Sequence, residues 1–120
     1  MNNKEIIGKI SKDIAITHSI LEYEEKVIVL YSDRYTHIER HKNEFIDEES
    51  YNNALNSLEK IISNPDYVYV DLRKNGLEFY KKIDENVCVA IRIDNRSNEL
   101  KIKSMYPVTQ SKIDNRKRLK

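Results

Sequence analysis

Alternating apolar and polar residues dominate the second half of the chain. Tyr67–Val70 is a β-branched and aromatic run, and Leu77–Ile83, Val87–Ile93 and Leu100–Lys103 alternate with period two. Short polar segments separate these runs, and one of them contains Asn75-Gly76, a strong signal for a type I′ hairpin turn. The pattern predicts a four-stranded antiparallel meander that reaches Pro107.

Helical spacing is clearest between Asp47 and Asn64. Asp47 is a plausible N-cap, and Pro65 predicts that the helix ends at Asn64. Apolar residues recur on one face at i, i+3, i+4 and i+7, namely Tyr51, Ala54, Leu55, Leu58, Ile61 and Ile62. One continuous amphipathic helix is therefore expected.

The first 45 residues carry shorter patterns. Ile6, Ile7 and Ile10 predict a helix over residues 4–12, and alternation from Ile14 to Ile20 predicts a strand. The run 27–31 is strand-like, and Asp33 can cap a helix over residues 35–43. A short helix after Thr109 completes the prediction. The fold class is α+β, with N-terminal helices packed on the four-stranded meander and a short C-terminal helix, in one domain over residues 1–120.

Composition and charge indicate the cellular compartment and the kind of partner that the protein could have. The chain has 120 residues and a formal net charge of +1, from 21 Lys and Arg against 20 Asp and Glu. Residues 112–120 hold five bases and one acid, so this segment has a charge of +4 and the rest of the chain has a charge of −3. The single cysteine, Cys88, fits a reducing compartment, and no apolar run is long enough for a membrane span. We expect a cytoplasmic protein with no membrane partner.

The histidine-containing segment 37–41 is the main candidate for chemistry. His37, Arg40 and His41 would share one face of a helix, at i, i+3 and i+4. Two imidazoles can exchange protons near neutral pH, and a guanidinium can bind phosphate. A zinc site is disfavoured, because only two ligands are present and Arg40 would repel a cation. An ordinary solvated helix and metal-independent RNA cleavage both remain open.

Basic residues elsewhere favour a phosphate ligand. Arg92, Lys101 and Lys103 should face away from the helices on the meander, although an ordinary solvated sheet face has the same pattern. The C-terminal strip adds Lys112 and Arg116, which could equally form a solvated tail.

The order of several segments resembles the phage-associated nuclease-like domains of the barnase–EndoU–colicin–RelE (BECR) group. These segments are Val27–Ser32, Thr36–His41, Ile61–Tyr67, Phe79–Lys82 and Ser104–Pro107, within about residues 8–116. The resemblance implies a metal-independent endoribonuclease without a cofactor, acting on tRNA or other RNA in a phage or bacterial conflict setting.

The resemblance also assigns roles to residues. It implies His37 and His41 as acid–base groups, Arg40 as a phosphate contact, and Ser104 or Thr109 as a polar group at the end of the last strand. Lys103, Lys112 and Arg116 become phosphate ligands, joined on the sheet face by Arg92 and Lys101. An inhibitor or immunity protein would then be a natural partner. The alternative is a non-catalytic module that binds RNA or a host defence protein.

Overall fold

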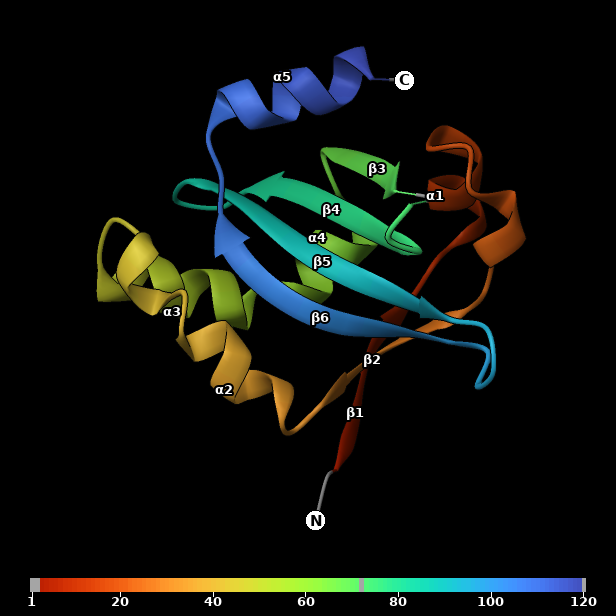
Figure 1. The fold of residues 1–120 in the computed structure, drawn as a ribbon, viewed down its shortest axis with the longest axis horizontal. Coiled ribbons are helices and arrows are strands. Elements are labelled where there is room, and N and C mark those ends of the chain that lie inside the picture. The colour runs from red at the N-terminus through yellow and green to blue at the C-terminus, as the bar shows by residue number, and fades with distance from the viewer. Residues whose placement is uncertain (1–2, 72, 120) are drawn as a thin grey trace.

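The computed structural model describes residues 3–71 and 73–119, whose strands form one six-stranded mixed sheet in the order β1-β2-β6-β5-β4-β3 (Figure 1). The strands are β1 Lys4–Lys9, β2 Val27–Tyr31, β3 Tyr67–Asp71, β4 Gly76–Lys82, β5 Asn86–Asp94 and β6 Glu99–Pro107. The α-helices are α1 Lys12–Thr17, α2 Arg34–Glu39, α3 Glu48–Asn56, α4 Leu58–Ser63 and α5 Gln110–Arg118. Two 3₁₀ turns, Leu21–Tyr23 and Lys42–Glu44, complete the set.

The predicted meander is present as β3–β6, and each consecutive pair in it is antiparallel. The turn before β4 differs from the prediction. Asn75 has a positive φ of 53°, but no glycine does, so the turn is not type I′. Gly76 is instead the first residue of β4 and pairs with Asp71 and Arg92.

The prediction of a four-stranded antiparallel sheet was wrong, because two N-terminal strands extend it. β2 pairs in parallel with β6, through Ile28 with Leu100 and Val29 with Lys101, and β1 pairs antiparallel with β2. A parallel pairing over such a distance in sequence leaves no local turn signal, so periodicity could not reveal it.

The first two N-terminal predictions were also wrong. Residues 4–9 form a strand rather than a helix, since they complete the edge of the sheet against β2. Residues 12–17 form a helix rather than a strand, because the Ser11 side chain caps it by accepting a hydrogen bond from the Ile14 amide. The alternation from Ile14 to Ile20 was misleading, and Ile16 is 56% exposed.

Two helical predictions need smaller corrections. The segment expected as one helix over 35–43 is α2 followed by a 3₁₀ turn, and Asp33 makes no side-chain cap bond. The helix expected from Asp47 breaks at Ser57, whose hydroxyl donates to the Asn53 carbonyl, giving α3 and α4. The Asp47 cap and the end at Asn64 are confirmed.

The sheet has two differently covered faces. One face packs against α3 and α4 and holds the main core, which includes Leu77, Phe79, Val89 and Ile102. The opposite face, termed the open face, carries α5 at one end, where a small second cluster forms around Ile113, and Arg34 and His41 border it along β6. None of the helices in the described parts of the chain is long and apolar enough to cross a membrane.

Gly76 should be required by the packing of β4 against β5. A Cβ at this position would lie 2.9 Å from the Ile91 carbonyl oxygen, which is backbone and cannot swing away. Gly76→Ala should lower the free energy of unfolding by about 1–3 kcal/mol, measured by urea denaturation. Gly8→Ala is the matched control, because its Cβ would meet only Ile62 at an ordinary 3.6 Å. Equal stabilities of the two variants would contradict this reading.

Candidate nucleic-acid interface and active site

A groove of about 890 Å³ crosses the open face of the sheet. Its walls come from the end of β2, the start of α2, the β3–β4 turn, the start of β4, and the central parts of β5 and β6. The groove thus spans segments that are distant in sequence but adjacent in the sheet. Its position, across several strand ends and beside a helix, suits an extended ligand.

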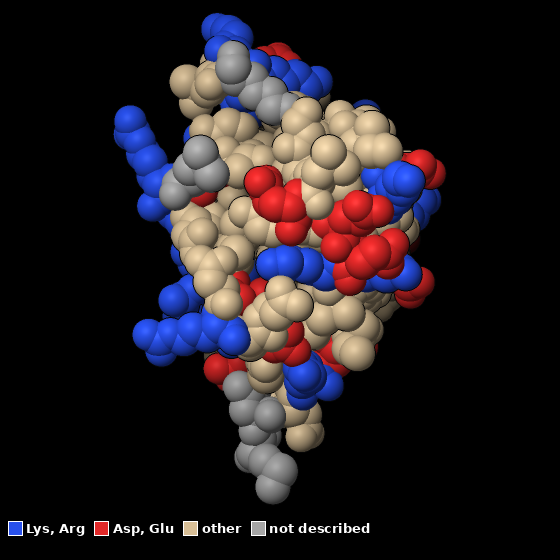
Figure 2. Space-filling model, turned by 90° about the vertical axis from the view of Figure 1, so that its right-hand side faces the viewer, with Lys and Arg blue, Asp and Glu red and all other residues tan. Residues whose placement is uncertain are grey.

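Cations outnumber acids in this groove. Five Lys or Arg side chains line it, against three acids, which leaves a local charge of +2 with His41 neutral. The bases are Arg34, Lys74, Arg92, Lys101 and Lys103, and the acids are Asp33, Asp71 and Glu78. In Figure 2, Lys and Arg side chains project along the left margin, which is the side that faces the reader in Figure 1. The predicted basic sheet face is therefore part of the groove.

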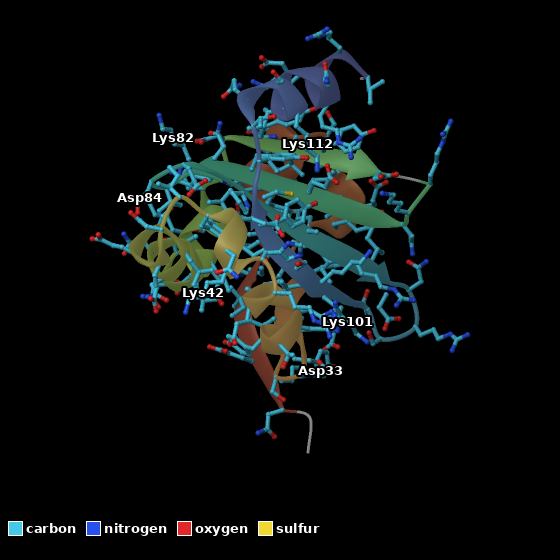
Figure 3. All side chains as sticks on the ribbon, turned by 60° about the vertical axis from the view of Figure 1, so that its left-hand side comes forward. Asp33, Lys42, Lys82, Asp84, Lys101 and Lys112 are labelled. Carbon is cyan, nitrogen blue, oxygen red and sulfur yellow. The ribbon has the colours of Figure 1, made fainter. Side chains whose placement is uncertain are left out.

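Lys101 is held in place by its neighbours. Its Nζ lies 2.7 Å from the Asp94 carboxylate and 5.2 Å from the centre of the Tyr31 ring. The hydrogen bond from Lys101, with backbone amides of the β5–β6 turn, holds the pKa of Asp94 well below its usual range. Lys101 lies on the open side of the sheet in Figure 3, near Asp33. Its charge is thus partly balanced, whereas the structure gives Arg92 no ion pair among the described residues.

His41 is the histidine that reaches the groove. Its Nδ1 lies 2.6 Å from a Glu44 carboxylate oxygen, and its ring lies 5.3 Å from that of Tyr106 on β6. The buried Ile38 and Phe45 anchor this segment on either side. A carboxylate on Nδ1 fixes the ring and leaves Nε2 to exchange a proton. This arrangement is what a general base or acid requires.

His37 and Arg40 lie elsewhere on the segment. Neither is among the groove-lining residues. The pKa of His37 is lowered, first by the nearby charge of Arg34, then by burial and by Arg40. The structure therefore does not place both histidines and Arg40 together in the groove.

Ser104 and Thr109 have different environments. Ser104 lines the groove, and its hydroxyl is buried without a hydrogen-bond partner among residues 3–71 and 73–119. Thr109 is outside the groove and caps α5 by accepting from the Lys112 amide at 3.2 Å. A buried unpaired hydroxyl is costly to the fold, which is typical of groups kept for a ligand.

The basic C-terminal strip is largely folded onto the protein. Arg116 donates to both carboxylate oxygens of Glu78, at 3.0 and 3.3 Å, and its guanidinium lies 4.6 Å from the Tyr69 ring centre. Lys112 lies 5.0 Å from the Tyr106 ring centre and is visible beneath α5 in Figure 3. Neither base lines the groove, and Lys120 lies outside the described residues. These two predicted phosphate ligands thus have internal partners.

Several groove residues were not predicted from the sequence, among them Glu78, Arg34 and Tyr106. Glu78 is only 8% exposed and accepts hydrogen bonds from Tyr80 and Arg116. Arg34 and Tyr106 gave no signal beyond their positions at the start of a helix and in the last strand. Cys88 is buried, and burial raises the pKa of its thiol to about 12. In the described segments, no three His, Cys, Asp or Glu side chains are placed to hold a metal ion together.

The sequence itself provides a family assignment. The sequence matches the family described as phage-Barnase-EndoU-ColicinE5/D-RelE like nuclease3 over residues 4–115, nearly the whole chain. The chain belongs to this family, which identifies it as a nuclease-like domain of phage type and confirms the resemblance. Searches of curated proteins and of solved structures found no match.

Removal of the Ser104 hydroxyl should not destabilise the fold. Because the hydroxyl is buried without a partner, Ser104→Ala should leave the free energy of unfolding unchanged or raise it. Ser50→Ala is the control, since the buried Ser50 hydroxyl donates to Glu85 at 2.7 Å. Its loss should cost about 1–3 kcal/mol in a denaturant titration. An equal loss in both variants would show that Ser104 has an internal partner.

The lowered pKa of His37 should depend mainly on Arg34. Arg34→Ala removes the largest cause of the shift, so the pKa of His37 should rise toward its ordinary value. Arg40→Ala should produce a smaller rise, since Arg40 has a weaker effect. Histidine NMR signals followed across the pH range measure both values. A larger effect of Arg40→Ala would contradict the described order of causes.

Proposed function

We propose that this domain is a metal-independent endoribonuclease that binds single-stranded or loop RNA, including tRNA loops, across the open face of its sheet. The observation that carries the proposal is the His41–Glu44 pair beside a cation-lined groove in a chain of a nuclease-like family. The family supports nuclease chemistry. RNA as substrate is inferred from side chains suited to 2′-hydroxyl attack.

In this mechanism His41 is the general base. Nε2 takes the proton of a 2′-hydroxyl while Glu44 holds Nδ1, and the 2′-oxygen attacks the adjacent phosphorus. The bond to the 5′-oxygen breaks and leaves a 2′,3′-cyclic phosphate. The 5′-oxygen takes a proton from water, and the hydroxide so formed takes the proton that His41 Nε2 has received. Arg92 and Lys103 bind the charged phosphate in the ground state and in the transition state alike. Ser104 donates a hydrogen bond to a phosphate oxygen after rotation of its side chain.

The form of the groove favours a flexible RNA strand. In-line attack requires the 2′-oxygen, phosphorus and 5′-oxygen to align, and an A-form duplex prevents that alignment whereas a splayed strand allows it. Sequence-specific RNA recognition also acts mainly on unpaired bases. A phage or bacterial conflict setting in the cytoplasm, where tRNA is an accessible target, fits the phage type of the family. An inhibitor or immunity protein that covers the groove would be the expected partner.

One observation favours a second candidate, a non-catalytic module that binds RNA or a host defence protein. Only one of the two histidines lines the groove, so the two-histidine arrangement suggested by the sequence is lacking there. Cleavage and binding assays on the same RNA separate the two functions. Stoichiometric binding without turnover would support the module.

Replacement of His41 should lower the RNA-cleaving activity far more than replacement of His37. We expect the protein to cleave tRNA or unstructured RNA in EDTA, and His41→Ala to lower kcat by about 10²–10⁴-fold. His37→Ala is the matched control and should retain most activity, because His37 does not line the groove. Glu44→Gln should give an intermediate loss. Circular dichroism checks folding, and equal losses in the two histidine variants would contradict the assignment.

A further inference from the structure

Over the stretch where β5 and β6 pair, from Val87 opposite Pro107 to Asp94 opposite Glu99, β6 contributes one residue more than β5. Ala90 pairs with Ser104 and Ile91 pairs with Ile102, so Lys103 has no opposite residue and forms a β-bulge. Ile102 and Met105 are both buried in the main core although two residues separate them. Only a bulge permits this spacing, because regular alternation would turn one of the two outward. Lys103 and Ser104 consequently lie side by side on the groove.

A side chain from another element provides hydrogen-bond donors for the backbone carbonyl of the bulge. Arg34, the first residue of α2, donates two hydrogen bonds to the Lys103 carbonyl oxygen, from Nε at 3.1 Å and from Nη2 at 2.8 Å. A bulge disrupts the ladder locally, so its backbone groups need other partners. Two donors from one planar guanidinium restrict both the distance and the orientation of the carbonyl.

This contact joins two walls of the groove. The chain leaving Arg34 runs through α2 and its buried Ile38 to His41, while the bulge carries Lys103 and Ser104. We infer that Arg34 is a positioning residue, which holds the β6 bulge so that Ser104 and Lys103 meet a bound phosphate at a fixed distance from His41. The inference deepens the proposed function and rests on it for its kinetic part.

Arg34 differs in this respect from the other groove arginine. Its Nε and one Nη2 hydrogen are committed to a backbone carbonyl, whereas Arg92 lies exposed on β5 with no ion pair among the described residues. A positioning residue acts on the reacting geometry and should change kcat. A phosphate ligand that binds ground state and transition state alike should change KM. Substitutions of Arg34 and Arg92 therefore allow the two roles to be compared directly, through their effects on kcat and KM.

The first experiment compares Arg34→Lys with Arg92→Ala. Arg34→Lys keeps the charge but loses the fork, so kcat should fall by about 10–100-fold with little change in KM, as expected for a displacement of about 1 Å. Arg92→Ala should raise KM and retain kcat. Amide hydrogen exchange at Lys103 and Ser104 should become faster in Arg34→Lys and stay unchanged in Arg92→Ala. An unchanged kcat together with unchanged exchange would overturn the inference.

A second pair of variants tests the bulge itself. Deletion of Lys103 would restore one-to-one pairing of β5 and β6 while keeping Ile102 and Met105 in the core, so the protein should still fold. Lys103→Ala removes the same cation but keeps the bulge and its carbonyl. The deletion should lower kcat by at least as much as Arg34→Lys, whereas Lys103→Ala should mainly raise KM. Equal kinetics in the two variants would overturn the role of the bulge.

The hydrogen-exchange measurement also separates this inference from the proposed function. If the wild-type protein cleaves no RNA, the proposed function fails, and protection at Lys103 and Ser104 still decides whether Arg34 holds the bulge. Binding of an uncleavable oligonucleotide, with 2′-deoxy sugars, would then replace kinetics. Arg34→Lys should leave the Kd of that oligonucleotide nearly unchanged, as it leaves KM, whereas Arg92→Ala should raise it. Unchanged exchange would again count against the inference.

Discussion

The parallel pairing of β2 with β6 is the contact on which the rest of the molecule depends. It joins residues 27–31 to a meander formed by residues 67–107, with Ile28 opposite Leu100. Without it, the meander would be an ordinary antiparallel sheet with helices on one face. With it, the chain leaves β2 beside β6 and enters α2 directly over the end of the groove. The long-range strand pairing therefore determines which side chains share the site.

The site combines three kinds of constraint on one short stretch of β6. The bulge sets the direction of Lys103 and Ser104, Arg34 fixes the bulge from α2, and Tyr106 packs beside the imidazole of His41. The open face also keeps features that do not favour stability, above all the unpaired Ser104 hydroxyl. Local departures from regular structure of this kind are common beside functional sites, where they re-aim side chains.

Local patterns predicted the meander, the capped helix after Asp47 and the basic sheet face, because each depends on neighbouring residues. They failed at residues 4–20, where the pairing of β1 with β2 outweighs helical spacing and the Ser11 cap outweighs alternation. The groove was predicted in part. Arg92, Lys101, Lys103, Ser104 and His41 line it, but the role of Arg34 depends on a bulge that no periodicity shows. His37 was grouped with His41 because the helix was expected to continue past Glu39.

The folding of α5 onto the open face changes the meaning of the C-terminal charge. Lys112, Arg116 and Lys117 each lie over a tyrosine ring, and Arg116 is also paired with Glu78. Bases that already have such partners displace fewer condensed counterions when a polyanion binds. The slope of binding affinity against salt concentration therefore depends mainly on the cations that have no internal partner. For this protein, the number of ions exchanged would reflect the groove, with Arg92 among its contributors, rather than the more basic tail.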